Sequence, residues 1–117
     1  MIKKEITING KTYPVAFSMD TMLNFEEIAD KSFFDTELKL MKDRMAIIMA
    51  AAITADAKTK LTVEELHGNG ELEAVQQIIA AFNIVMKASK EFFKIPDVEP
   101  KDEKPAEEQT DEEKAKN

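Results

Sequence analysis

Apolar and polar residues alternate along the first part of the chain, on both sides of Asn9-Gly10. This dipeptide favours a type I′ turn, because both central residues of that turn need positive φ. A two-residue turn also fixes which residues face each other, so the pattern predicts a β-hairpin over residues 2–17 with one apolar face. The apolar face is predicted to consist of Ile2, Ile6, Ile8, Tyr13, Val15 and Phe17.

Pro14 lies inside the predicted second strand, although proline lacks the N–H group that a sheet ladder uses. In the predicted register Pro14 faces Glu5 in a non-hydrogen-bonded pair, in which each N–H points away from the partner strand. Pro14 therefore costs the hairpin no hydrogen bond, and it closes the outer edge of the second strand to a further strand. We expect residues 2–8 to be the edge that remains open.

Beyond the hairpin, apolar residues recur three and four positions apart, which predicts helices. Ser18 and Thr36 are predicted N-caps, and Thr62 with Glu65 forms a capping-box pattern. The predicted helices cover about residues 19–29, 37–55, 63–67 and 71–94. The fold class that follows is α+β and mainly α, with the N-terminal hairpin packed on a bundle of about three to four helices.

The apolar stripes of these helices predict which side chains face the core. The first helix has Met19, Met22, Leu23 and Ile28, with Phe25 less central; the second has Leu38, Met41, Met45, Ile48, Met49 and Ala52; the last has Leu72, Val75, Ile79, Phe82, Met86 and Phe93, flanked by Ile78, Val85 and Phe92. In the second helix, Lys39, Lys42, Asp43 and Arg44 are predicted to contact solvent.

The composition divides the chain into two parts. Residues 96–117 hold nine acidic residues against four lysines, a net charge of −5 out of −7 for the whole chain, and almost no apolar residues. We expect a disordered acidic tail or linker there, after a single domain over residues 1–95. The negative charge argues against nucleic-acid binding.

The chain has no cysteine, and its longest apolar run, residues 46–53, is far too short to span a membrane. The N-terminal segment also lacks the apolar run of a signal peptide. These features predict a soluble cytoplasmic protein.

No constellation of residues predicts catalysis. His67 is the only histidine and suits the C-terminal end of a helix, where a partly charged imidazole complements the dipole. Glu26 and Glu27 are adjacent on a helix and point about 100° apart, so they do not form an acid pair. We expect no enzyme activity, no cofactor and no metal.

Protein binding is the remaining class. Adjacent Phe residues on one element do not easily face the same core, so at least one ring of each Phe pair is expected near the surface. Methionine at four-residue spacing either fills the core or forms an adaptable partner surface. The candidate partner-binding residues are Phe33, Phe34, Met41, Met45, Met49, Phe92 and Phe93.

The N-terminal third also resembles tail assembly chaperones of long-tailed bacteriophages and prophages. The motifs that carry the resemblance are Asn9-Gly10-Lys11, Tyr13-x-Val15-x-Phe17, Ser18-Met19, Phe25-Glu26-Glu27 and Lys31-Ser32-Phe33. Members often have glycine where this chain has Asp30, and the layout of the later helices fits as far as about residue 95.

The resemblance implies a non-enzymatic chaperone in the cytoplasm of a host bacterium, absent from the mature virion. It implies binding of the long, helical tape measure protein before the tail tube polymerises, with possible self-association. It also implies a longer frameshifted form that recruits the major tail protein, with the segment after Pro96 as its linker. A small cytoplasmic adaptor or regulatory protein-binding domain is the alternative.

Overall fold

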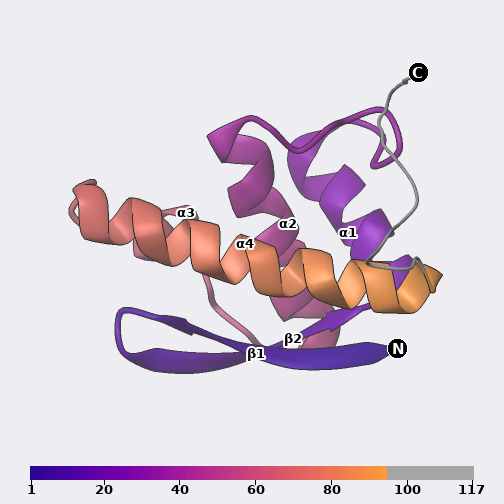
Figure 1. Ribbon diagram of the computed structural model, residues 1–117, viewed down its shortest axis with the longest axis horizontal. Helices are drawn as coiled ribbons and strands as arrows, with labels where there is room; N and C mark the ends of the chain where they lie inside the picture. The colour runs from indigo at the N-terminus through magenta and orange to yellow at the C-terminus, as the bar shows by residue number, and fades with distance from the viewer. Residues whose placement is uncertain (95–117) are drawn as a thin grey trace, which may run out of the picture.

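The computed structural model describes residues 1–94, so the predicted acidic tail over 96–117 lies outside the described residues. Its elements are β1 (Ile2–Ile8), β2 (Lys11–Phe17), α1 (Met19–Ala29), α2 (Met41–Ala55), α3 (Val63–His67) and α4 (Leu72–Phe93). An N-terminal hairpin packed with four helices confirms the predicted fold class for this part of the chain (Figure 1).

The hairpin has the predicted register, with Glu5 opposite Pro14 and Ile6 opposite Tyr13. Asn9 and Gly10 both have positive φ, 53° and 80°, as a type I′ turn requires. One face is buried through Ile6, Ile8, Val15 and Phe17, whereas the other is exposed except at Ala16, whose carbonyl accepts from the Thr21 hydroxyl of α1. The Asn-Gly turn thus decides which side chains enter the core.

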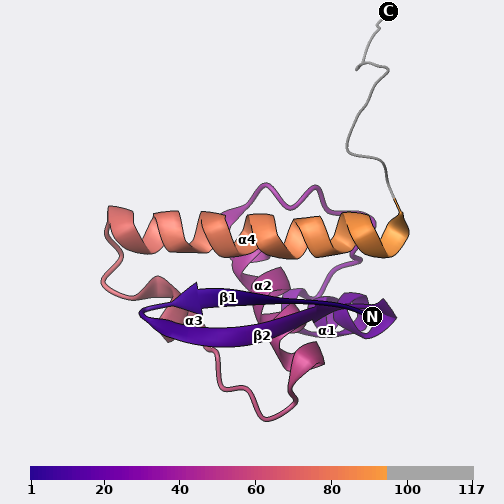
Figure 2. The same cartoon turned by 60° about the horizontal axis from the view of Figure 1, so that its bottom comes forward.

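The helices cover the apolar face of the hairpin, with α2 in the middle and α4 running along the β1 side (Figures 1 and 2). Asn9 ties the turn to two helices. Its main-chain N–H donates to Gln77 Oε1 of α4 at 2.7 Å, and its side-chain amide donates to the Glu65 carbonyl of α3 at 2.9 Å. These bonds fix both helices against the end of the hairpin.

Helix α2 begins at Met41, so the predicted start near residue 37 and the predicted cap at Thr36 are wrong. The Thr36 hydroxyl accepts instead from the Leu38 N–H at 3.2 Å, and Leu38 has a left-handed φ of 57° that interrupts a helix. Leu40 occupies the N-cap position without a side-chain hydrogen bond. Residues 30–40 therefore form a loop with internal polar bonds.

Helix α1 begins and ends as predicted, but the side it buries differs. Phe25 and Thr21 are fully buried, whereas Met19 and Leu23 are more than half exposed. Thr21 is buried because its hydroxyl donates to the Ala16 carbonyl at 2.8 Å while also completing a capping box with Ser18. Asp30 ends the helix in the left-handed conformation that glycine adopts most easily.

Helix α4 buries the flank of its predicted stripe, at Ile78 and Val85, more deeply than the centre of that stripe. Its buried residues are Ala74, Ile78, Ala81, Val85 and Ala88. Three of these five are alanines, whose small side chains allow the backbone of α4 to lie close to its neighbours. The predicted stripe of larger residues therefore lies beside the core stripe and not on it.

Candidate binding surfaces

The larger residues of α4 form a row that the domain covers only in part, with Phe82 and Met86 half-buried against the core. Leu72, Ile79, Met86 and Phe93 are spaced by seven, and Val75, Phe82 and Ser89 lie between them at intervals of three and four. We call these seven residues the α4 seam. None of them is buried, and Leu72 is 69% exposed. A seven-residue apolar repeat is the pattern by which one helix packs along another.

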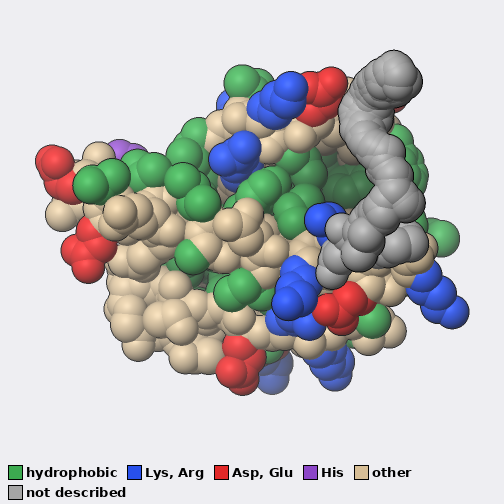
Figure 3. Space-filling model, in the orientation of Figure 1, with side chains coloured by type: hydrophobic (Ala, Val, Ile, Leu, Met, Phe, Trp, Pro, Cys, Tyr) green, Lys and Arg blue, Asp and Glu red, His purple; other side chains and the backbone are tan. Residues whose placement is uncertain are grey.

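The start of α2 forms the opposite wall of this seam. The Arg44 guanidinium lies 4.8 Å from the centre of the Phe82 ring, which brings the first turns of α2 beside the middle of α4. Arg44 is held there by donating from Nε to the Leu38 carbonyl at 2.9 Å. Leu40 and Met41 precede it and are both exposed, and apolar side chains gather in the hollow between α4 and α2 (Figure 3).

The two Phe pairs meet at the C-terminal end of the seam. Phe33 lies 5.8 Å and Phe92 lies 5.6 Å, between ring centres, from the buried Phe17. The outer rings, Phe34 and Phe93, lie 6.3 Å apart. Phe34 is 74% exposed and Phe93 37%, which matches the expectation that one ring of each pair lies at the surface. This aromatic cluster joins the end of α4 to the loop before α2.

A buried acid holds the loop that carries Phe33 and Phe34. Asp43 was predicted to contact solvent, but it is 3% exposed. Asp43 Oδ2 lies 3.0 Å from Lys31 Nζ and accepts from the Thr36 hydroxyl at 3.3 Å. The Glu26 carboxylate also accepts from the Phe33 N–H at 3.0 Å. The prediction failed because the partners of Asp43 come from the loop, where helical spacing gives no information.

The methionine row does not form one surface. Met49 is buried, whereas Met45 is half-buried and Met41 is 39% exposed. Met45 and Met49 line a cleft of about 260 Å³ together with Ile28, Ala29, Lys42, Asp43, Ala46 and Val63. Of the three methionines, only Met41 lies at the start of α2 that faces the seam.

The structure gives no catalytic arrangement to the residues that were considered for catalysis among residues 1–94. His67 Nδ1 lies 3.0 Å from the Gly68 carbonyl at the end of α3, and the capping box of Thr62 with Glu65 is formed as predicted. Glu27 is exposed on α1 and far from His67 in sequence. Within residues 1–94, no group of three or more histidine, aspartate or glutamate side chains is placed to hold a metal ion.

Comparisons with protein-family models, with curated proteins and with solved structures find no match for this chain. In the part of the chain that the structure describes, no helix has both the length and the apolar character needed to cross a bilayer. Among residues 1–94, the α4 seam and the aromatic cluster are apolar surfaces that connect at Phe93.

Proposed function

We propose that this chain is a tail assembly chaperone of a long-tailed bacteriophage or prophage. In this proposal it binds the tape measure protein without catalysis and keeps it soluble until the tail tube polymerises around it. It acts in the cytoplasm of the host bacterium and is absent from the mature virion. A longer form made by frameshifting would recruit the major tail protein, and copies would associate along the client.

The α4 seam is the observation that carries this proposal. A helical client presents apolar residues at intervals of three and four, and the seam repeats at the same intervals over 22 residues of helix. That length corresponds to about 33 Å, enough for about six turns of a bound helix. Leu40 and Met41 on one side would contact the same client helix.

The aromatic cluster supports the same proposal at the end of the seam. Exposed aromatic rings contribute strongly to protein interfaces, because each buries a large area with few rotatable bonds. Phe34 and Phe93 pack edge-on against the inner rings Phe33 and Phe92, with ring centres 5.4 Å and 5.1 Å apart. This packing limits the side-chain conformational entropy that the two outer rings would lose when a partner binds. The rigid cluster would fix one end of the client helix.

Co-expression with the tape measure protein of the phage or prophage that encodes this chain tests the proposal. We expect the two proteins to co-purify and the client to remain in the soluble fraction. Ile79→Ser and Phe34→Ser, made as separate variants, should each reduce the affinity about tenfold or more, because a loss of about 1.4 kcal/mol is a factor of ten and interface hot spots contribute about 2 kcal/mol or more. Affinity is measured by titrating purified client segments.

Leu23→Ser is the matched control, since Leu23 is 55% exposed on α1, outside the seam and the cluster. It removes the same kind of exposed apolar side chain and should leave the affinity unchanged. A client that is equally soluble without this chain, or equal losses in all variants, would contradict the proposal. Tight binding of an unrelated host protein through the seam would favour the adaptor function instead.

A further inference from the structure

The outer edge of β1 carries main-chain groups without a partner strand. In the observed register the N–H and C=O groups of Lys3, Glu5 and Thr7 point away from β2. Among residues 1–94, the main-chain bonds outside the β1–β2 ladder include none to these three residues, and their side chains are exposed. Pro14 closes the other edge, so a further strand can join only at β1.

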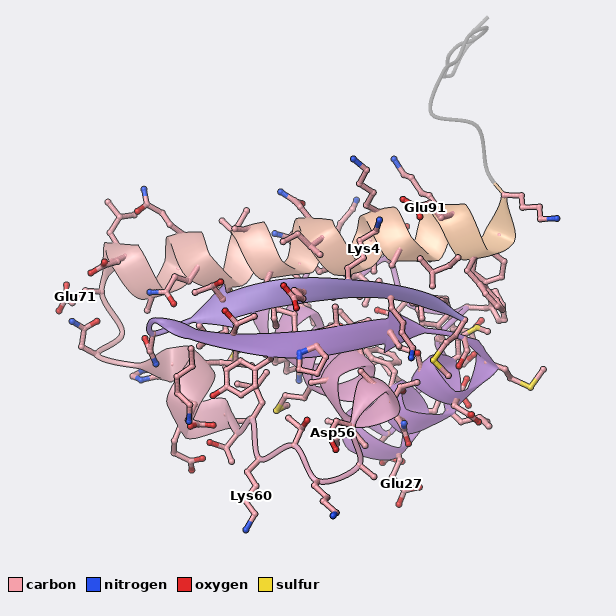
Figure 4. The ribbon with its side chains drawn as sticks, turned by 90° about the horizontal axis from the view of Figure 1, so that it is seen from below. Lys4, Glu27, Asp56, Lys60, Glu71 and Glu91 are labelled. Atoms are coloured by element: carbon pink, nitrogen blue, oxygen red, sulfur yellow. The ribbon has the colours of Figure 1, made fainter. Side chains whose placement is uncertain are left out.

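Helix α4 extends over the position that such a strand would take. The Asn9–Gln77 bond and the Lys4–Glu91 ion pair of 2.9 Å set α4 antiparallel to β1 (Figure 4). Seen from below, α4 runs beyond β1 on the side away from β2, and Figure 1 places it above the hairpin. We call the position that a third strand would take beside β1, beneath α4, the slot.

Helical spacing identifies the residues above this slot. Gln77, Ile84 and Glu91 are spaced by seven and lie over β1, as the contacts of the first and last show. The next row outward is Ala80, Lys87 and Lys94, and all three are exposed. The small side chain of Ala80 leaves room near the hairpin turn, and two lysines lie toward the other end.

A second copy of this chain does not fit the slot by antiparallel pairing of the two β1 edges, because that pairing puts both α4 helices on the same face of the joined sheet. Pairing β1 with β1 of another molecule would put the two strands about 4.8 Å apart, whereas packed helices need about 8–10 Å between their axes. Because each α4 extends past its own β1, the two helices would occupy the same space. The slot admits one extended segment that brings no covering helix.

We propose that the β1 edge binds a single extended peptide segment of a partner protein, added as a third strand under α4. The charges define this segment. Lys3 on the open face and the two lysines of α4 favour acidic residues near Ile2, whereas Glu5 favours a basic residue opposite it. This surface lies on the opposite side of α4 from the seam and does not depend on the function proposed above.

A capped synthetic peptide, Thr-Val-Lys-Glu-Glu-Val, tests the proposal on the full chain. Paired antiparallel from Thr7 to Ile2, it puts its Lys opposite Glu5 and its second Glu opposite Lys3. The matched control, Thr-Val-Glu-Glu-Lys-Val, has the same composition but puts like charges opposite each other. We expect saturable binding at millimolar concentrations or below, at least about threefold tighter for the first peptide.

Amide exchange measured by NMR locates the binding. The first peptide should slow exchange at Lys3, Glu5 and Thr7 and leave the amides of the α4 seam unchanged. Glu5→Pro should abolish binding without unfolding the hairpin, because the N–H it removes points outward, as at Pro14. Lys87→Glu keeps the edge intact and should weaken binding several-fold, so the test does not depend on the proline variant.

Three results would overturn the proposal. The first is no saturable binding, or equal binding of both peptides. The second is protection of the edge amides in the full chain that disappears when the chain ends at Lys94, which would assign the edge to residues 95–117. The third is a dimer in which the same amides are protected, which would assign it to a second copy.

Discussion

The two long helices, α2 and α4, use their apolar residues in opposite ways. Every residue of α2 from Ala46 to Ala52 is buried, whereas α4 buries a narrow stripe that includes three alanines and leaves Leu72, Ile79 and Phe93 exposed beside it. A helix that is apolar on all sides belongs in a core, and one with a second apolar stripe has a face left for a partner. Thus α2 lies within the core of the domain, whereas α4 contributes to the core and also exposes part of a second apolar stripe.

Equal truncations in the two helices test this comparison with the largest expected effect. Ile48 in α2 is fully buried, and Ile48→Ala should lower the free energy of unfolding by about 2–4 kcal/mol through lost burial and a residual cavity. Ile79 in α4 is 39% exposed, and Ile79→Ala should cost less than about 1 kcal/mol. Urea unfolding of both variants measures the difference, and equal losses would refute the assignment of roles.

The acidic residues in the first turns of the two helices give a second, smaller contrast. Asp43→Ala in α2 removes the partner of Lys31 and of the Thr36 hydroxyl, and should cost about 1–2 kcal/mol. Glu73→Ala in α4 removes an exposed charge from the first turn, where it interacts with the helix dipole. This change should lower the free energy of unfolding by about 0.3–0.5 kcal/mol. Thermal unfolding of both variants measures these losses. Similar shifts would mean that Asp43 contributes no more than a surface charge.

Substitutions at the N-cap positions of the two helices distinguish an effect on domain stability from an effect on client binding. Neither Leu40 of α2 nor Glu71 of α4 makes a side-chain cap bond, so a serine at either position should stabilise the domain by about 0.5–1 kcal/mol. Leu40→Ser also removes an exposed apolar residue beside the seam and should weaken client binding, whereas Glu71→Ser should not. Melting temperatures and client titrations on both variants check this; weaker binding of Glu71→Ser would contradict it.

Short-range chemistry made part of the fold predictable. Asn9-Gly10 fixed the hairpin register, because only a few residues accept the backbone angles of that turn. The capping box of Thr62 and Glu65 placed α3 to the residue. In both cases the determining residues lie within four positions of each other.

Long-range packing explains what the sequence did not predict. The start of α2 depends on Thr36, Leu38 and the Lys31–Asp43 pair, which link a loop to a helix across 12 positions. The buried side of α4 depends on close approach to the hairpin, which favours alanines over larger residues of greater hydrophobicity. The larger residues are more hydrophobic than alanine, so their helical spacing predicted that they lie at the centre of the buried stripe.

The candidate surfaces were predicted in part. The Phe33-Phe34 and Phe92-Phe93 pairs pointed to surface rings, and the structure brings both pairs together around Phe17. Of the methionines, Met49 belongs to the core and Met41 to the surface, a division that four-residue spacing does not reveal. Leu40 was not predicted as a surface residue, because the predicted helix began before it. Its exposure follows from the N-cap position, where leucine is rarely found.

The bonds of Asn9 have a consequence for the order of synthesis. The hairpin needs only residues 2–17, but Asn9 binds Glu65 and Gln77, which lie 56 and 68 positions later. At about 5–20 residues per second, the ribosome needs roughly 4–15 seconds to go from the end of β2 to the end of α4. During that time α2 can cover the β2 side of the apolar face, but the β1 side, with Ile6 and Ile8, has no α4 to cover it.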